Sequence, residues 1–88
     1  MSALSKGFKI IDAVTTAGKA GLPFAAIVEA TNLPKASAHR LLKELVEISA
    51  LTRDEQSRHY RGGLLLARIG ASVTSNYDFR ETARPYLQ

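Results

Sequence analysis

The chain has 88 residues, 45% hydrophobic and 23% charged, which is the composition of one small globular domain and not of a disordered or collagen-like chain. Twelve lysines and arginines against eight aspartates and glutamates give a net charge of +4, which favours a polyanionic partner. The lack of cysteine excludes disulfides, thiolate metal sites and thiol nucleophiles, and no apolar run approaches the ~18–20 residues that span a bilayer. We therefore expect a cytoplasmic protein with no membrane partner.

The first expected helix runs from about Ser5 to Ala17. Ser5 is its expected N-cap, and Gly18 and Gly21 supply the stop signal. Apolar residues recur at steps of three and four, as they do on one buried face of a helix: Leu4, Phe8, Ile11 and Val14. This face is expected to join a small core.

A tight turn is expected between the next two helices. The second helix, residues 24–31, places four residues on one face: Phe24, Ile27, Val28 and Thr31. The segment 32–34 then interrupts the chain, because Pro34 disfavours helical geometry in the preceding residue and suits the first position of a new helix.

The third expected helix, residues 34–47, has the sharpest pattern in the chain. Five apolar residues form an unbroken stripe that faces a core: Ala38, Leu41, Leu42, Leu45 and Val46. The opposite face is polar and cationic, with these residues at its centre and flanks: Ala36, Arg40, Lys43 and Glu47, then Lys35, Ser37 and His39.

After the third helix the pattern changes from helical to alternating. Residues 50–53 and 58–61 are expected to form a β-hairpin, with residues 54–57 as a four-residue loop. Leu51 and Tyr60 are expected to point inward. Three arginines remain in water in this arrangement: Arg53, Arg58 and Arg61.

Two further helices are expected toward the C-terminus. Residues 64–75 have apolar residues at helical spacing: Leu65, Leu66, Ile69 and Val73. Asp78 and Glu81 have the spacing of a capping box, which starts another helix at Phe79. A chain this short builds a thin core, and the apolar residues of the first and fourth helices exceed what that core needs. We therefore expect the chain to pair with a second copy of itself on DNA, and only weakly without DNA.

Three helices, a tight turn between the second and third, and then a hairpin are the order of a winged helix-turn-helix domain. The fold class is therefore mainly α-helical with a small β-hairpin, followed by a linker helix. A DNA major groove about 12 Å wide admits a helix that buries one side and presents short polar and cationic side chains on the other. The third helix meets both requirements, and the arginine-rich hairpin suits a wing that lies on neighbouring phosphates or in the minor groove.

Three segments resemble IclR-type bacterial transcriptional regulators: Leu33 to Leu45, Tyr60-Arg61 before a glycine, and Asp78 to Leu87 with its Arg-Pro-Tyr-Leu ending. The resemblance covers essentially the whole chain. It implies sequence-specific binding to double-stranded DNA, with the helix over 34–47 in the major groove and the wing over 50–61 on the backbone or in the minor groove. The DNA-contacting residues that it implies are Lys35, Ala36, Ser37, His39, Arg40, Lys43, Arg53, Arg58 and Arg61.

The resemblance also implies a domain organisation. Residues 1–63 correspond to a DNA-binding domain, 64–77 to a linker helix, and 78–88 to the start of a C-terminal effector-binding domain that is otherwise missing. The implied partners are palindromic operator DNA, a second copy of the chain, and a small-molecule effector that binds only the missing domain. Gly62 stands where an apolar residue is usual in the family.

Other function classes fit the sequence less well. An enzyme needs convergent carboxylates, a Ser-His-Asp set or a metal cluster, whereas the acidic residues here are scattered and His39 and His59 lie far apart. We therefore expect no enzyme, no cofactor and no metal site. The alternative is a winged helix that binds only protein, with its basic face on an acidic partner. Titration with random duplex DNA distinguishes the two, because a DNA-binding domain binds it weakly and loses affinity steeply as salt rises.

Overall fold

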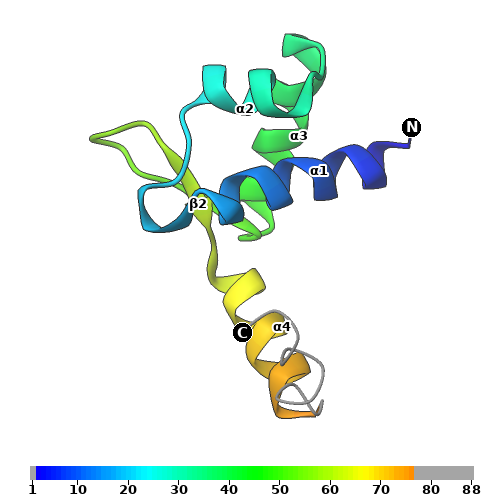
Figure 1. The fold of residues 1–88 in the computed structure, drawn as a ribbon, viewed down its shortest axis with the longest axis vertical. Helices are drawn as coiled ribbons and strands as arrows, with labels where there is room; N and C mark the ends of the chain where they lie inside the picture. Colours follow the sequence, from blue (N-terminus) through cyan, green and yellow to red (C-terminus); the bar gives the residue numbers. More distant parts are fainter. Residues whose placement is uncertain (1, 77–88) are drawn as a thin grey trace, which may run out of the picture.

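Three helices pack together, a small hairpin follows them in the chain, and a fourth helix extends away from this group (Figure 1). The structure is a computed structural model that describes residues 2–76. In chain order the elements are α1 (Ala3–Thr16), a 3-10 turn η1 (Gly18–Ala20), α2 (Phe24–Thr31), α3 (Lys35–Glu47), β1 (Leu51–Arg53), β2 (Tyr60–Gly62) and α4 (Leu64–Ser75). This order confirms the predicted class, helical with a small hairpin. The helix expected from Phe79 lies outside the described residues.

Helix α1 begins at Ala3, so the prediction that Ser5 caps it is wrong. The N-cap is Ser2, whose hydroxyl accepts a hydrogen bond from the backbone N–H of Ser5 at 3.1 Å. Ser5 is therefore inside the first turn, and its own N–H is the group that the cap satisfies. At the other end Gly18 and Gly21 have φ angles of 80° and 67°, in keeping with the predicted stop.

The turn between α2 and α3 is built on Asn32, which has a left-handed backbone and ends α2 by donating its N–H to the Val28 carbonyl at 2.8 Å. Helix α2 has the predicted bounds. Pro34 is the N-cap of α3 rather than its first residue, and its carbonyl accepts from the N–H of Ala38 at 2.9 Å. This short turn connects the end of α2 directly to the start of α3.

The core lies where α1, α2, α3 and β1 meet. Its largest fully buried side chains are Ile10, Val14, Ile27, Thr31, Leu42 and Leu51. The one polar member, Thr31, donates its hydroxyl to the Ile27 carbonyl at 2.7 Å, so the polar atom that it brings into the core is paired. The predicted stripe of α3 is confirmed, since three of its members are buried and the other two pack half-buried against the same cluster: Ala38, Leu41, Leu42, then Leu45 and Val46.

The hairpin exists as predicted, but its strands and register differ from the prediction. The paired residues are Leu51 with Gly62, Thr52 with Arg61 and Arg53 with Tyr60. The connecting loop therefore covers 54–59 instead of 54–57. It is longer because the Asp54 carboxylate closes a turn of its own, accepting from the Gln56 N–H at 3.2 Å and the Ser57 hydroxyl at 2.9 Å.

A third segment pairs with the hairpin on the outer edge of β2. The N–H of Leu22 donates to the Tyr60 carbonyl at 3.0 Å, and the N–H of Tyr60 donates to the Leu22 carbonyl at 2.7 Å. Gly21 allows this approach, because a Cβ atom at that position would overlap the Tyr60 carbonyl oxygen. The His59 ring adds a hydrogen bond from Nδ1 to the Ala20 carbonyl at 2.9 Å. These bonds hold the hairpin against the segment that precedes α2.

Helix α4 has the predicted bounds and leaves the body of the domain at Gly63, its N-cap (Figure 1). None of its residues is fully buried. Leu65 and Leu66, near its start, are half-buried, whereas the residues from Ala67 onward in the described part are exposed. Helix α4 therefore presents apolar side chains that the described chain does not cover.

Candidate nucleic-acid interface

Helix α3 turns its polar face to solvent. Six residues of this helix are predicted to contact DNA. Ser37 is half-buried at the margin of the polar face, and the other five are exposed: Lys35, Ala36, His39, Arg40 and Lys43. Ala38, Leu41 and Leu42 are buried on the opposite side. The structure thus brings these six residues together on one accessible face. Their contact with DNA stays a prediction.

His39 is oriented by an aromatic contact that the sequence pattern did not predict. Its ring lies edge-on to the ring of Phe24 in α2, with centroids 6.1 Å apart and planes at 75°. This is a favourable arrangement for two rings, and it ties the middle of α3 to the start of α2. His39 therefore stands in the exposed face with a restricted orientation.

The three hairpin arginines have different environments. Arg58 lies in the loop, not in a strand, with a left-handed φ of 63°, and it is exposed. Arg61 is exposed on β2. Arg53 is half-buried, so the prediction that all three remain in water is wrong for it. Its guanidinium lies 5.9 Å from the centroid of the Tyr60 ring, which the side-chain alternation alone did not indicate.

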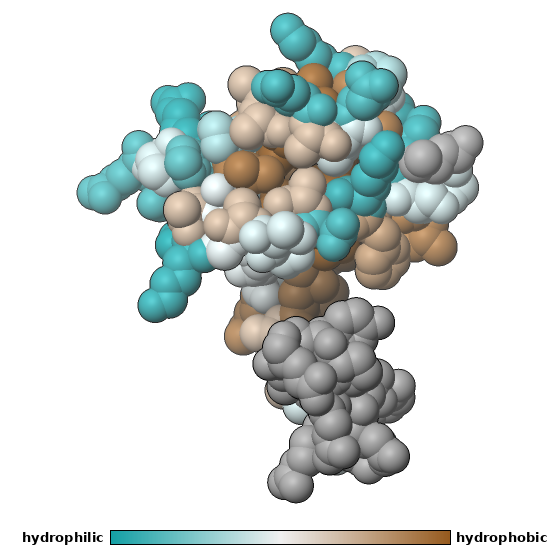
Figure 2. All heavy atoms as spheres, viewed as in Figure 1, coloured by the Kyte–Doolittle hydropathy of each residue, from teal (hydrophilic) through white to brown (hydrophobic). Residues whose placement is uncertain are grey.

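The loop also carries a negative charge. Hydrogen bonds from the Ser57 hydroxyl and the Gln56 N–H, with a smaller contribution from the charge of Arg61, hold the pKa of Asp54 below its ordinary value of 3.8. Asp54 is therefore ionised at neutral pH. Hydrophilic side chains project from the hairpin side of the molecule, at the left in Figure 2.

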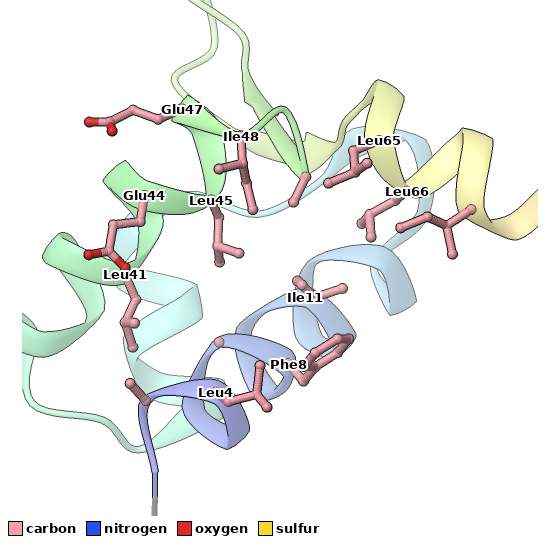
Figure 3. Close-up of a pocket in the computed structure, with 14 residues that line it drawn as sticks. Leu4, Phe8, Ile11, Leu41, Glu44, Leu45, Glu47, Ile48, Leu65 and Leu66 are labelled. Atoms are coloured by element: carbon pink, nitrogen blue, oxygen red, sulfur yellow. The ribbon is translucent and has the colours of Figure 1, made fainter.

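A second surface feature is an apolar groove between α1, the end of α3 and the start of α4, with a volume of about 600 Å³. Figure 3 shows apolar side chains of all three helices pointing into it, while the carboxylates of Glu44 and Glu47 point away. Its most exposed large members are Leu4 at 73%, Phe8 at 60%, Ile48 at 58% and Ile69 at 45%. Brown, hydrophobic atoms are visible near the start of α4 in Figure 2.

Residues 2–76 contain neither a cluster of metal-binding side chains nor a helix that could span a membrane. No cluster of three or more histidine, aspartate or glutamate side chains is arranged to hold a metal ion in this part of the chain. Within the same residues, no helix combines the length and the apolar character that a membrane span requires.

A family model for the IclR helix-turn-helix domain matches residues 3–55, which include α1, α2, α3 and β1. The chain belongs to the IclR family. Relatives of this IclR-family chain include the HTH-type transcriptional regulator KipR of Bacillus subtilis strain 168, 34% identical over 70 residues that cover 80% of this chain and 28% of KipR. The regulator TsaQ1/TsaQ2 of Comamonas testosteroni is 32% identical over 85 residues, which cover 97% of this chain and 30% of that protein.

Solved structures with the same fold include an IclR-family regulator. A regulator from Brucella abortus superposes with a TM-score of 0.73 at 29% identity, over 97% of this chain and 32% of the other. For Pseudomonas aeruginosa HmgR the TM-score is 0.82 at 20% identity, over 97% of this chain and 35% of HmgR. The chain spans about a third of the length of the proteins that it matches.

These comparisons confirm three predictions from the sequence. The chain is an IclR-type protein, its fold is the winged helix of that family, and its relatives are transcriptional regulators rather than enzymes. It contains the DNA-binding helix-turn-helix domain of such a regulator.

Proposed function

We propose that this domain binds a palindromic operator as a homodimer, with α3 in the major groove and the hairpin on the adjacent backbone or in the minor groove. The observation that carries the proposal is the position of Arg40 and Lys43, which are exposed on the face of α3 opposite its buried stripe. A helix held in this way can enter a groove without losing its core contacts. DNA binding of this kind would let the protein act as a repressor or an activator of transcription.

The two parts of the interface have different roles in this proposal. Arg40 is near the centre of the exposed face of α3 and is suited to a bidentate bond with a guanine edge. Lys35, Ser37, His39 and Lys43 surround it, and Ala36 is small enough to let the helix approach the bases. Arg53, Arg58 and Arg61 neutralise phosphates from the hairpin.

The second copy of the chain is proposed to cover the apolar groove. Leu4 and Phe8 on α1 and Ile69 on α4 are large, well exposed and line the same groove. Single exposed apolar side chains are common on a protein surface, but a group of them on one face is typical of an interaction site. Pairing of two such faces about a twofold axis buries them and places the two α3 helices to read a symmetric site. A dimer that forms through this groove would therefore require an operator with the same twofold symmetry.

Two further proposals concern the control of the full regulator and its location. The chain spans about a third of its relatives' length, so we propose that effector control belongs to a part of the full regulator that this chain does not contain. The effector is proposed to be a small molecule. A cytoplasmic location is proposed for the regulator because its target is DNA.

Selection of bound sequences from a random duplex pool tests the proposal. The expected result is a motif of two inverted halves separated by about one DNA turn, ~34 Å, or a multiple of it. A single unrepeated half, bound one-to-one in sedimentation, would contradict the dimer. Affinity for random duplex that does not fall as salt rises would contradict DNA binding itself and favour a protein partner.

A further inference from the structure

A hollow of about 290 Å³ lies between α3 and the hairpin. Its polar lining comprises His39, Lys43, Glu47, Arg53 and Tyr60. Lys43 and Arg53 contribute two positive charges from different elements, one from the helix and one from the hairpin. Glu47 contributes one negative charge. The hollow is therefore net cationic, and it opens beside the exposed face of α3.

Arg53 and Tyr60 are direct cross-strand partners. Tyr60 bonds through its N–H and its carbonyl to Leu22 on the other side, so its pair with Arg53 is of the type that is not hydrogen-bonded. Side chains approach most closely in such pairs. This register is why the guanidinium carbon of Arg53 lies 5.9 Å from the Tyr60 ring centroid, within the range of cation–aromatic attraction.

The contact with Tyr60 restricts Arg53 before any ligand arrives. The Nε atom of Arg53 is shielded from solvent and has no hydrogen-bond partner within residues 2–76. An arginine that binds a phosphate ordinarily loses rotamer freedom and hydration water. Arg53 has already lost part of both in the free domain, whereas the exposed Arg58 has not. Binding an anion is therefore less costly for Arg53 than for Arg58.

We propose that this hollow binds one phosphate of the DNA backbone between Lys43 and Arg53, and that Tyr60 is the residue that positions Arg53 for it. The inference rests on the proposed DNA binding and adds a role for a residue that does not itself touch the bases. A phosphate held by both the helix and the hairpin sets the depth and register of α3 in the groove. Glu47, at the same hollow, opposes the anion.

A double-mutant cycle on the 88-residue chain tests this role. Affinity for the selected operator and for random duplex is measured across a salt series for Tyr60→Leu, Arg53→Gln and the double variant. Tyr60→Leu is expected to lower affinity about three- to tenfold per subunit, the size of one cation–aromatic contact, without changing the net charge. Arg53→Gln is expected to lower affinity at least as much and to shallow the salt dependence by ~0.9 per subunit.

The decisive result is the coupling between the two positions. In the double variant, Tyr60→Leu is expected to cost little beyond Arg53→Gln, because there is no guanidinium left to position. Tyr60→Phe keeps the ring face and is expected to bind like the wild type. The matched control combines Tyr60→Leu with Arg58→Asn, a pair that is expected to be additive.

Additive losses for Tyr60→Leu and Arg53→Gln, or a loss in Tyr60→Phe equal to that in Tyr60→Leu, would overturn the role of Tyr60 while leaving DNA binding intact. Failure of the wild-type chain to bind any duplex would overturn the proposed function as well. Thermal melting verifies that each variant is folded. If Tyr60→Leu does not fold, Tyr60→Met replaces it in the same cycle.

Discussion

The backbone of Gly63 lies directly against the carbonyl oxygen of Ser49, at the junction between the hairpin and α4. The N–H of Gly63 donates to the Ala50 carbonyl at 2.9 Å, and the N–H of Leu65 donates to the Ser49 carbonyl at 3.0 Å. A Cβ atom at position 63 would overlap that Ser49 oxygen. Only glycine at position 63 allows the segment that follows α3 and the start of α4 to come this close.

Gly63→Ala is expected to destabilise the domain by about 1–3 kcal/mol, because backbone must move to admit the new methyl group. Gly62→Ala is the matched control one residue away. Its Cβ would lie 3.6 Å from Thr15 Cγ2, an ordinary contact, so this variant is expected to be as stable as the wild type or slightly more stable. Urea unfolding of both variants measures the difference, and equal losses would show that the junction at Gly63 tolerates a side chain.

Arg40→Ala is expected to reduce affinity for the operator by roughly 1–3 kcal/mol more than affinity for random duplex, because a guanine contact discriminates between bases. Arg58→Asn is expected to weaken both complexes alike and to reduce the salt slope of a dimer by about 2, since each subunit loses one phosphate contact worth ~0.9. Asparagine is chosen because it tolerates the φ of 63° at this position. Binding isotherms at several salt concentrations provide both quantities. An equal reduction for Arg40→Ala on both duplexes would transfer the base-reading role to His39, because Lys43 is proposed to bind a phosphate.

Phe8→Glu is expected to shift the chain from dimer to monomer, because it places a charge in the apolar groove. The fold of each copy is expected to survive, since Phe8 is 60% exposed. Lys9→Gln is a control with the same change in net charge, on the adjacent, exposed residue of α1 that does not line the groove. Sedimentation velocity gives the oligomeric state, and a Phe8→Glu variant that still dimerises would exclude the groove as the interface.

Ser57→Ala is expected to raise the pKa of Asp54 toward its ordinary value of 3.8, because the Ser57 hydroxyl is the largest cause of the lowered value. The Asp54 pKa is lower in the folded than in the unfolded chain. Its contribution to stability is therefore present above pH 3.8 and is lost as the pH falls through the folded-state value. The Ser57→Ala variant should lose less stability than the wild type on acidification.

Carboxyl NMR titration gives the Asp54 pKa, and urea midpoints at neutral pH and below its ordinary value give the stability change. Gln56→Ala is the control, because it keeps the backbone N–H that Asp54 accepts from. An Asp54 carboxyl that titrates at 3.8 in the wild type would contradict the prediction.

Much of the helical part of this domain was predictable from local sequence. The bounds of α2 and α4 match the prediction, because the apolar period and the flanking Pro23, Pro34 and Gly63 are local signals. The exposed face of α3 was predictable for the same reason, since a helix that buries one stripe must expose the opposite one. The error at the start of α1 is also local: Ser2 and Ser5 are both good caps, and only the backbone geometry distinguishes them.

The hairpin shows where local sequence stops being sufficient. Side chains alternate with a period of two, so a register shifted by two residues still points Leu51 and Tyr60 inward, and the pattern cannot distinguish the registers. The turn at Asp54 and the left-handed Arg58 lengthen the loop and bring Tyr60 opposite Arg53.

The sequence by itself determined the element types, the cationic face of α3 and the resemblance to the IclR family. Only the tertiary structure decided which arginine is restrained and which residues hold the hairpin in place. The physical reason is distance along the chain. The pairing of Leu22 with Tyr60 and the bond from His59 to Ala20 join segments far apart in sequence, and the contact of Arg53 with Tyr60 exists only in the register that such pairings and the loop produce.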